Sequence, residues 1–235
     1  WSDVEVWVSG EHPDFKTRPP DRQMTVRDLL SHQSGLTYGF TDDNPVDRVY
    51  PKLIQRQAFE RPLPEWSNTL AGLPLLYSPG TAWNYSVSTD LCGYLVEVIS
   101  GKQFDAFLEE RILGPLGMAD TAFYVPDDKL DRFAACYSPT EDGGFVLQDD
   151  PETSAYRRTP KLLSGGGGMV STASDYYRLC QMLLNGGELE GQRVLSRKTV
   201  ELMTANHLPG GKSLAEHAIP GRWSEATYDG IGFGL

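Results

Sequence analysis

One tyrosine stands where its phenol could act as an acid or a base. Tyr85 follows the turn residues Pro79 and Gly80 and precedes a run of apolar residues at helical spacing, so it marks the point where a loop becomes a helix. Backbone N–H groups and the helix dipole at such a point favour negative charge and would stabilise a phenolate. The spacing alone fits a buried aromatic ring with a satisfied hydroxyl better. The residues by themselves leave both interpretations open.

Four consecutive glycines at residues 165–168 form a second candidate site. Neither G-x-x-x-x-G-K-[ST] nor G-x-G-x-x-G with its strand context is present, which disfavours a nucleotide site. Backbone without Cβ atoms lets a ligand or another segment approach closely. A sharp turn between a strand and a helix is an equally good interpretation.

A nucleophile is not visible in the chain. No G-x-S-x-G and no S-x-x-K occurs, and the paired carboxylates Glu109 and Glu110 are assigned to a solvated helix surface. No His-x-x-x-His or C-x-x-C pair suggests a metal, and we expect neither a metal nor another cofactor. The three cysteines are interpreted as small core residues: Cys92, Cys136 and Cys180.

Composition excludes other classes of protein. The 235 residues carry 21 Lys and Arg against 32 Asp and Glu, a net charge of −11 that repels phosphate backbones and argues against a nucleic-acid partner. No stretch reaches the ~20 apolar residues of a membrane span. Residues 1–5 carry no basic or apolar signal region. Any signal peptide would precede them, so cytoplasm and periplasm both stay open, as does the oligomeric state.

Periodicity and turn residues predict the elements around these sites. Thr25 and Asp28 are expected to cap a short helix that Gly35 ends, and prolines divide residues 37–79 into short helical pieces. Further helices are expected at 91–99, at 104–113 with its end at Gly114 and Pro115, at 175–184 after a cap at 172 or 174, and near 196. Strands are expected at 4–8, at 121–125, in a hairpin of 134–137 with 145–147, and at the start of 230–235.

Four segments in order resemble one family. Residues 25–36 resemble T-V-R-x-L-L-x-H-x-S-G-L, residues 79–87 P-G-x-x-x-x-Y-S-x, residues 112–118 I-x-x-P-L-G-M, and residues 164–173 S-G-G-G-G-L-V-S-T-A. These are signatures of the serine β-lactamase-related hydrolases, which include class C β-lactamases, D-alanyl carboxypeptidases and the family VIII esterases. Within this family the chain most resembles the family VIII carboxylesterases. The four motifs lie between residues 25 and 173.

The resemblance implies a fold and a mechanism. The fold is α+β, of the β-lactamase/transpeptidase type: an antiparallel sheet flanked by helices, with residues 25–120 as a mostly helical subdomain and 121–235 returning to the α/β part of one domain. In this family the serine of S-x-x-K forms an acyl-enzyme, and its lysine and a tyrosine share the proton traffic. Tyr85 would be the general base, with Ser86, Val87, Gly166 and Gly167 as substrate-binding candidates and a small ester or amide as the substrate.

Two departures from the family pattern shape the expected function. Val87 replaces the amide of Y-x-N, which favours simple esters over β-lactams. The S-x-x-K and the final sheet motif would lie before residue 1 and after residue 235, so the chain is interpreted as the central piece of a longer hydrolase and as inactive alone. Variants of this function are β-lactamase, D-aminopeptidase or acyltransferase activity. The alternative is a non-catalytic module that binds a ligand or a protein in the same cleft.

Overall fold

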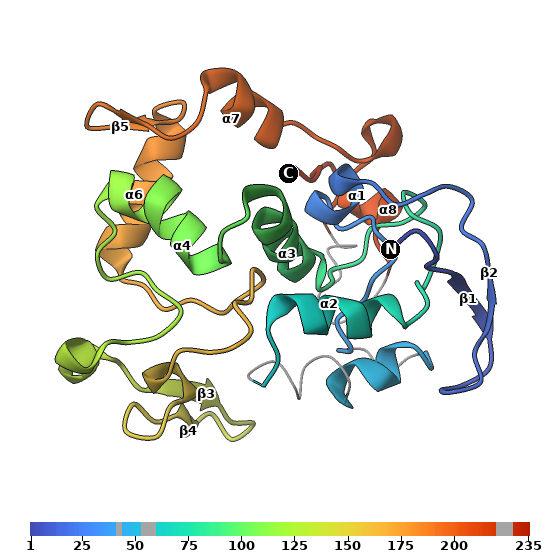
Figure 1. Cartoon of the computed structure of the whole chain (residues 1–235), viewed down its shortest axis with the longest axis horizontal. Helices are drawn as coiled ribbons and strands as arrows, with labels where there is room; N and C mark the ends of the chain where they lie inside the picture. The colour runs from blue at the N-terminus through green and yellow to red at the C-terminus, as the bar shows by residue number, and fades with distance from the viewer. Residues whose placement is uncertain (41–43, 53–59, 220–227) are drawn as a thin grey trace.

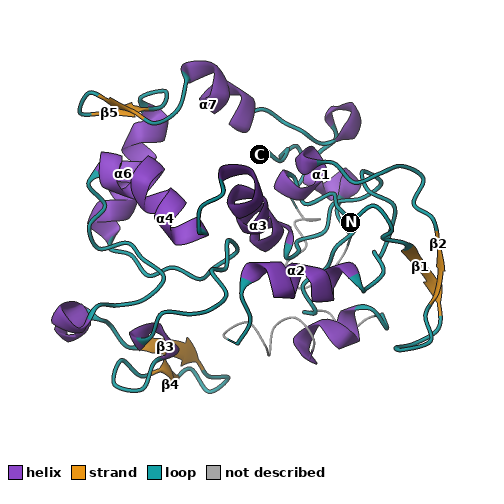
Figure 2. Ribbon diagram, in the orientation of Figure 1, coloured by secondary structure: helices purple, strands orange, loops and turns teal. Residues whose placement is uncertain are grey.

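The computed structural model describes residues 1–40, 44–52, 60–219 and 228–235. Helices form most of the regular structure, and the described strands pair into three separate two-stranded antiparallel sheets. In Figure 1, α3 (Ser88–Ser100) lies near the centre, with α1 (Val26–Leu30) and α2 (Leu63–Ala71) towards one end of the molecule and α4 (Phe104–Leu108) and α6 (Ala173–Leu184) towards the other. Figure 2 shows that loops connect most of these elements.

The remaining elements are short. The helices are α5 (Gly114–Leu116), α7 (Arg197–Met203) and α8 (Leu214–His217). The strands are β1 (Val6–Ser9) with β2 (Lys16–Arg18), β3 (Cys136–Pro139) with β4 (Phe145–Asp149), and β5 (Glu188–Leu189) with β6 (Gln192–Arg193). The first strand and the β3–β4 hairpin confirm the predicted strand and hairpin. In the hairpin Tyr137 pairs with Leu147 and Pro139 with Phe145.

Side-chain caps explain where three helices begin. Thr25 and Asp28 form the predicted capping box of α1, and Thr172 accepts a hydrogen bond from the backbone N–H of Asp175 at the start of α6. Ser196 caps α7 in the same way. Such a cap satisfies an N–H group that has no partner within the helix. These predicted starts are therefore confirmed, whereas α8 was not predicted.

The predicted ends of three helices differ in how well they agree with the structure. Gly101 ends α3 with a φ of 69°, as expected. The helix at Thr25 ends at Leu30, before Gly35, and the chain then turns at His32 with a φ of 54°. The helix from Phe104 does not end at Gly114: it continues through a π-helical turn, Glu109–Leu113, into α5, which contains Pro115, and it ends at Gly117, where φ is 64°.

Two predicted strands are wrong. Residues 121–125 contain one isolated bridge, in which Ala122 pairs with Val170. An alternating pattern forms a strand only when a neighbouring strand pairs along its length, and here the partner segment turns into α6. Residue 230 lies in a turn and residues 231–235 have no regular secondary structure, although the N–H of His207 donates to the carbonyl of Phe233 at 2.7 Å.

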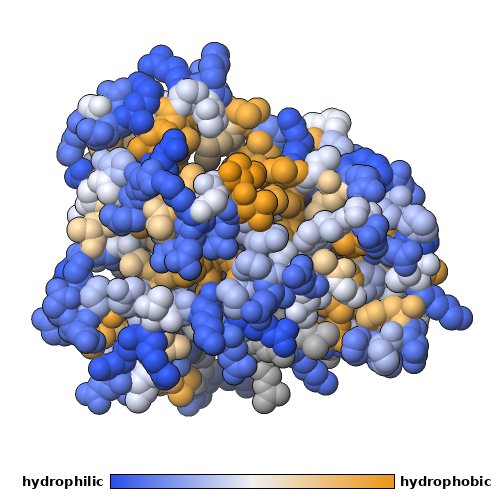
Figure 3. All heavy atoms as spheres, viewed as in Figure 1, coloured by the Kyte–Doolittle hydropathy of each residue, from blue (hydrophilic) through white to orange (hydrophobic). Residues whose placement is uncertain are grey.

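The largest hydrophobic core lies under α1, α2 and α3. Leu29, Trp66, Leu70 and Leu91 are buried in it together with Leu36. A smaller cluster joins the end of the α4–α5 run to α6. Figure 3 shows apolar side chains on the surface where α3 lies, and Val98 and Ile99 of that helix are 58% and 80% exposed. None of the helices in the described ranges is long and apolar enough to cross a membrane.

The interpretation of the cysteines as core residues is wrong for Cys136 and Cys180, whereas Cys92 packs against the largest core cluster. Cys136 and Cys180 are exposed and Cys92 is half-buried. Cys136 lies on a two-stranded hairpin whose residues are mostly exposed, and Cys180 lies on the outward face of α6, which buries Met182. A small side chain can be buried, but whether it is buried depends on which face of its helix or strand it occupies.

Candidate active site

Three chain segments frame Tyr85. The N–H of Asn84 donates to the carbonyl of His32 at 2.9 Å, and the N–H of Val87 donates to that of Thr37 at 3.1 Å. These bonds tie the segment before α3 to the segment after α1. The N–H of Trp83 donates to the carbonyl of His217 at 2.9 Å, so α8 supports the same strip of backbone. Tyr85 therefore lies on backbone that is fixed on both sides.

The ring of Tyr85 lies within a row of stacked rings. Its centroid is 5.0 Å from that of His32 and 5.6 Å from that of Tyr38, and the planes of Tyr38 and Tyr85 are 8° apart. Phe40 stacks on Tyr38 at 4.3 Å. Tyr85 is half-buried, so it is neither a core residue nor a free surface side chain. Offset stacking of this kind restricts the orientation of the phenol.

His32 is a neutral imidazole. Its Nδ1 accepts a hydrogen bond from the backbone N–H of Ser86 at 3.2 Å, and because an N–H can only donate, that nitrogen carries no proton. The Oγ of Ser86 lies 3.2 Å from the same atom. Burial lowers the pKa of His32 to about 4, so the ring is uncharged at neutral pH. Tyr85 thus stacks on a ring without charge.

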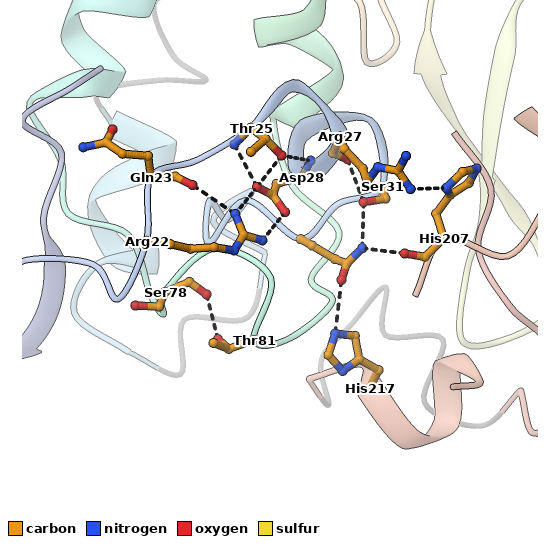
Figure 4. A network of polar contacts seen from close by, with 11 residues as sticks. Arg22, Gln23, Thr25, Arg27, Asp28, Ser31, Ser78, Thr81, His207 and His217 are labelled. Carbon is orange, nitrogen blue, oxygen red and sulfur yellow. Dashed lines mark hydrogen bonds and ion pairs between the residues drawn. The ribbon is translucent and has the colours of Figure 1, made fainter. Parts of the chain in front are cut away.

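A polar network holds the segment that carries His32 (Figure 4). Both carboxylate oxygens of Asp28 accept from Arg22 at 2.7 Å. Burial would raise the pKa of Asp28, but the hydrogen bonds from Arg22 and Thr25 hold it below its usual value. The amide of Gln33 donates to Ser31 at 2.7 Å and accepts from the Nε2 of His217 at 3.3 Å. The network therefore joins α1 to α8.

Ser86 and Val87 lie in the interior, where they are 0% and 2% exposed. The hydroxyl of Ser86 lies 2.7 Å from that of Ser88, which lies 2.7 Å from that of Ser34. Val87 packs in the largest core cluster. Both side chains thus support the backbone on either side of Tyr85 and offer almost no surface.

The glycine loop lies beside the row of rings. A Cβ placed on Gly166 would come within 3.3 Å of the hydroxyl oxygen of Tyr38. Gly167 is exposed, and a Cβ there would meet no atom within 4 Å. The structure therefore places Gly166 beside Tyr38, whereas Gly167 faces open space and its carbonyl accepts a hydrogen bond from the hydroxyl of Tyr156 at 3.4 Å.

Sequence reasoning from single residues missed His32 and Tyr38, and also Asp90, whose Oδ1 accepts a hydrogen bond from the N–H of Gly166 at 3.2 Å. His32 lies inside the first motif segment and Tyr38 two residues beyond it, so the motif itself was the available signal. Asp90 follows Tyr85 by five residues and has no signal of its own in the sequence. Within the described ranges no group of three or more His, Cys, Asp or Glu side chains is placed to hold a metal ion.

Comparison with known proteins identifies the family. The Beta-lactamase family matches residues 3–221. Protein Rv1367c of Mycobacterium tuberculosis is 37% identical over 99% of this chain and 55% of its own length. Lovastatin esterase of Penicillium rubens is 30% identical over 85% of this chain and 48% of its own length. The chain thus spans about half the length of these curated relatives.

A solved structure gives the same result for the fold. Unliganded simvastatin synthase (LovD) from Aspergillus terreus superposes with a TM-score of 0.69 at 27% identity, over 89% of this chain and 50% of that one. The chain therefore belongs to the Beta-lactamase family and has an α+β fold of the β-lactamase/transpeptidase type. Both the resemblance seen in the four motifs and the predicted fold class are confirmed.

Proposed function

We propose that this chain is part of a serine hydrolase that cleaves small carboxylic esters through an acyl-enzyme, with Tyr85 as the general base. The observation that carries the proposal is the placement of Tyr85. Its half-buried ring is held between His32 and Tyr38 at the start of α3, in the family's Y-S-x motif. The esterase and acyltransferase names of relatives support the same class.

In the proposed reaction Tyr85 accepts the proton of a serine hydroxyl as its oxygen attacks the ester carbonyl. The tetrahedral intermediate then breaks the bond to the alcohol oxygen, and the proton passes to that oxygen as the alcohol leaves. Water repeats the sequence on the acyl-enzyme and releases the acid. The serine and its lysine belong to an S-x-x-K, which these 235 residues do not contain and the complete protein is expected to supply.

The environment of Tyr85 is consistent with this role. A neutral His32 neither repels a lysine ammonium near the phenol nor competes with the phenol for that cation. Val87, at the third position of the motif, is buried in the core, so no amide from this position reaches the substrate. Exposed Gly167 faces open space one residue from Gly166, where a Cβ would lie 3.3 Å from the hydroxyl oxygen of Tyr38.

The test is a Tyr85→Phe substitution in the complete protein. With p-nitrophenyl butyrate as substrate we expect kcat to fall by about 10²–10⁴-fold, the usual contribution of a positioned general base. Tyr137→Phe, on an exposed hairpin, is the matched control and should leave kcat unchanged. Near-normal turnover by the Tyr85 variant contradicts the role. A complete protein that neither turns over esters nor gains mass with a fluorophosphonate favours the binding module instead.

A further inference from the structure

A buried carboxylate joins the glycine loop to the helix that follows Tyr85. Asp90 is the third residue of α3 and is 3% exposed. Its Oδ1 accepts hydrogen bonds from the hydroxyl of Ser164 and from the backbone N–H of Gly166, the latter at 3.2 Å. One side-chain atom thus holds two positions of a loop that lies more than 70 residues further along the chain.

The loop lies on α3 so closely that only glycine fits. A Cβ on Gly165 would stand 2.3 Å from the carbonyl oxygen of Thr89, and one on Gly166 would stand 2.8 Å from the Oδ2 of Asp90. Real Cβ contacts essentially never approach below 3.0 Å. Two glycines and one carboxylate therefore form a fitted joint between the loop and the first turn of α3.

The opposite side of the loop faces outward. Gly167 is exposed and its missing Cβ would meet nothing within 4 Å, although it lies only one residue from the joint. A Cβ placed on Gly166 would also lie 3.3 Å from the hydroxyl oxygen of Tyr38, and the ring of Tyr38 stacks on that of Tyr85. Movement at the joint would therefore shift the loop relative to the row of rings.

Hydrogen bonding by Asp90 accounts for its burial. Burial raises the pKa of Asp90, and the hydrogen bonds from Ser164 and Gly166 oppose that shift. An uncompensated buried carboxyl group is costly, and the two donors supply the compensation. An asparagine in this place keeps an acceptor oxygen, whereas an alanine leaves the N–H of Gly166 without this partner.

We propose that Asp90 is a positioning residue that anchors the glycine loop, residues 164–168, to α3, so that the open side of Gly167 borders the substrate next to Tyr85. The anchoring is a statement about the chain itself. The part concerning substrate rests on the proposed function.

The experiment compares Asp90→Ala with Asp90→Asn in the complete protein. Hydrogen exchange of the amides in residues 164–168, followed by mass spectrometry, should accelerate about tenfold or more in the alanine variant, as expected for a lost hydrogen bond. The asparagine variant should exchange within about threefold of the parent, because its Oδ1 accepts the same bonds. With p-nitrophenyl butyrate, the alanine variant should raise KM about tenfold with a smaller change in kcat, and asparagine should restore it.

Asp175→Ala is the matched control. Asp175 is also the third residue of its helix, is 6% exposed, and accepts from the N–H of Asp120 at 2.8 Å and the hydroxyl of Thr121 at 2.9 Å. Its loss should destabilise the fold to a similar extent but leave KM and exchange at 164–168 unchanged. Should Asp90→Ala fail to fold, Ser164→Ala removes one donor and should still accelerate exchange.

Three results overturn the proposal. Unchanged exchange in the Asp90→Ala and Ser164→Ala variants removes the anchor. An asparagine variant as defective as alanine shows that the acceptor oxygen is not what matters. Faster exchange with an unchanged KM removes the link to substrate. If the parent protein has no esterase activity, the proposed function fails, and the exchange measurement still decides the anchor by itself.

Discussion

The surroundings of Tyr85 and the outer layer around α6 are held together by different forces. Around Tyr85 the contacts are stacked rings, hydrogen bonds to the neutral His32, and glycine backbone packed onto α3. The ion pair of Arg22 with the buried Asp28 supports the segment that carries His32. In the outer layer, ion pairs at exposed or half-exposed positions recur: Lys129 and Arg132 with Asp120, Arg178 with Glu190, and Arg193 with Glu188.

This difference determines what each region responds to. Close-packed, uncharged contacts are sensitive to added atoms and to protonation, and salt screens them little. Exposed ion pairs contribute little, tolerate substitution and weaken as ionic strength rises. For the role proposed for Tyr85 the first kind of contact has an advantage, because the geometry of the phenol then depends little on salt concentration.

The largest expected effect concerns two neighbouring glycines. Gly165→Ala places a Cβ 2.3 Å from a backbone oxygen of α3, and we expect a loss of about 3 kcal/mol, at the upper end of overpacking costs. Gly167→Ala meets no atom within 4 Å, and its φ lies outside the left-handed region. It should be neutral or stabilising by about 0.4–1 kcal/mol. Urea unfolding of both variants provides the measurement.

These two variants test whether the surroundings of Tyr85 are packed more tightly than the outer layer around α6. Equal stabilities for the two would show that the loop adjusts to an added methyl group as an exposed loop does. The joint with α3 would then be no tighter than the outer layer.

Local sequence signals predicted much of the secondary structure. Thr25, Thr172 and Ser196 each cap a helix because a short polar side chain before an apolar run satisfies a free N–H group. Residues 121–125 were mistaken for a strand because pairing depends on a partner that alternation does not reveal. The exposure of Cys136 likewise depends on what covers its hairpin.

The site was predictable only in part. Tyr85 and the glycine loop were singled out by their position in the sequence and given roles by motif resemblance, and motifs name residues without giving their contacts. The stacking of His32 and Tyr38 on Tyr85 and the hydrogen bond from Gly166 to Asp90 join segments that lie far apart in sequence. Contacts of this kind follow from the packed fold, so no local spacing encodes them.

Protonation of His32 is expected to have an effect of intermediate size on the free energy of unfolding. Its pKa of about 4 in the folded protein lies below 6.5, its ordinary value, so between these values the unfolded chain binds a proton that the folded chain does not. The contribution of the neutral His32 to the free energy of unfolding is therefore fully present above a pH of about 6.5, and it is lost as the pH falls towards 4. From pH 7 to pH 5 we expect a loss of about 2 kcal/mol from this group.

The measurement is urea unfolding at both pH values for the parent and for His32→Asn. Asparagine can adopt the positive φ of 54° at this position and offers an acceptor near the place of Nδ1, but it does not titrate. The variant should lack this part of the pH dependence, whereas His12→Asn, at an exposed position, should keep it. A parent and a His32 variant with the same pH dependence would contradict the uncharged site.

The smallest effect is expected at Asp120, whose carboxylate lies 2.8 Å from both Lys129 and Arg132. Hydrogen bonds from these two side chains lower its pKa to about 2, so the contribution is present above pH 3.8 and is lost as the pH falls towards 2. Asp120→Asn should lower the unfolding midpoint only slightly at low salt. In about 0.5 M sodium chloride the difference from the parent should shrink, because salt weakens ion pairs near the surface. The effect of Gly165→Ala should be the same at both salt concentrations, because added salt does not relieve a steric contact. A salt-independent loss at Asp120 would mean that this outer pair is held as rigidly as the surroundings of Tyr85, and the distinction between the two regions would not stand.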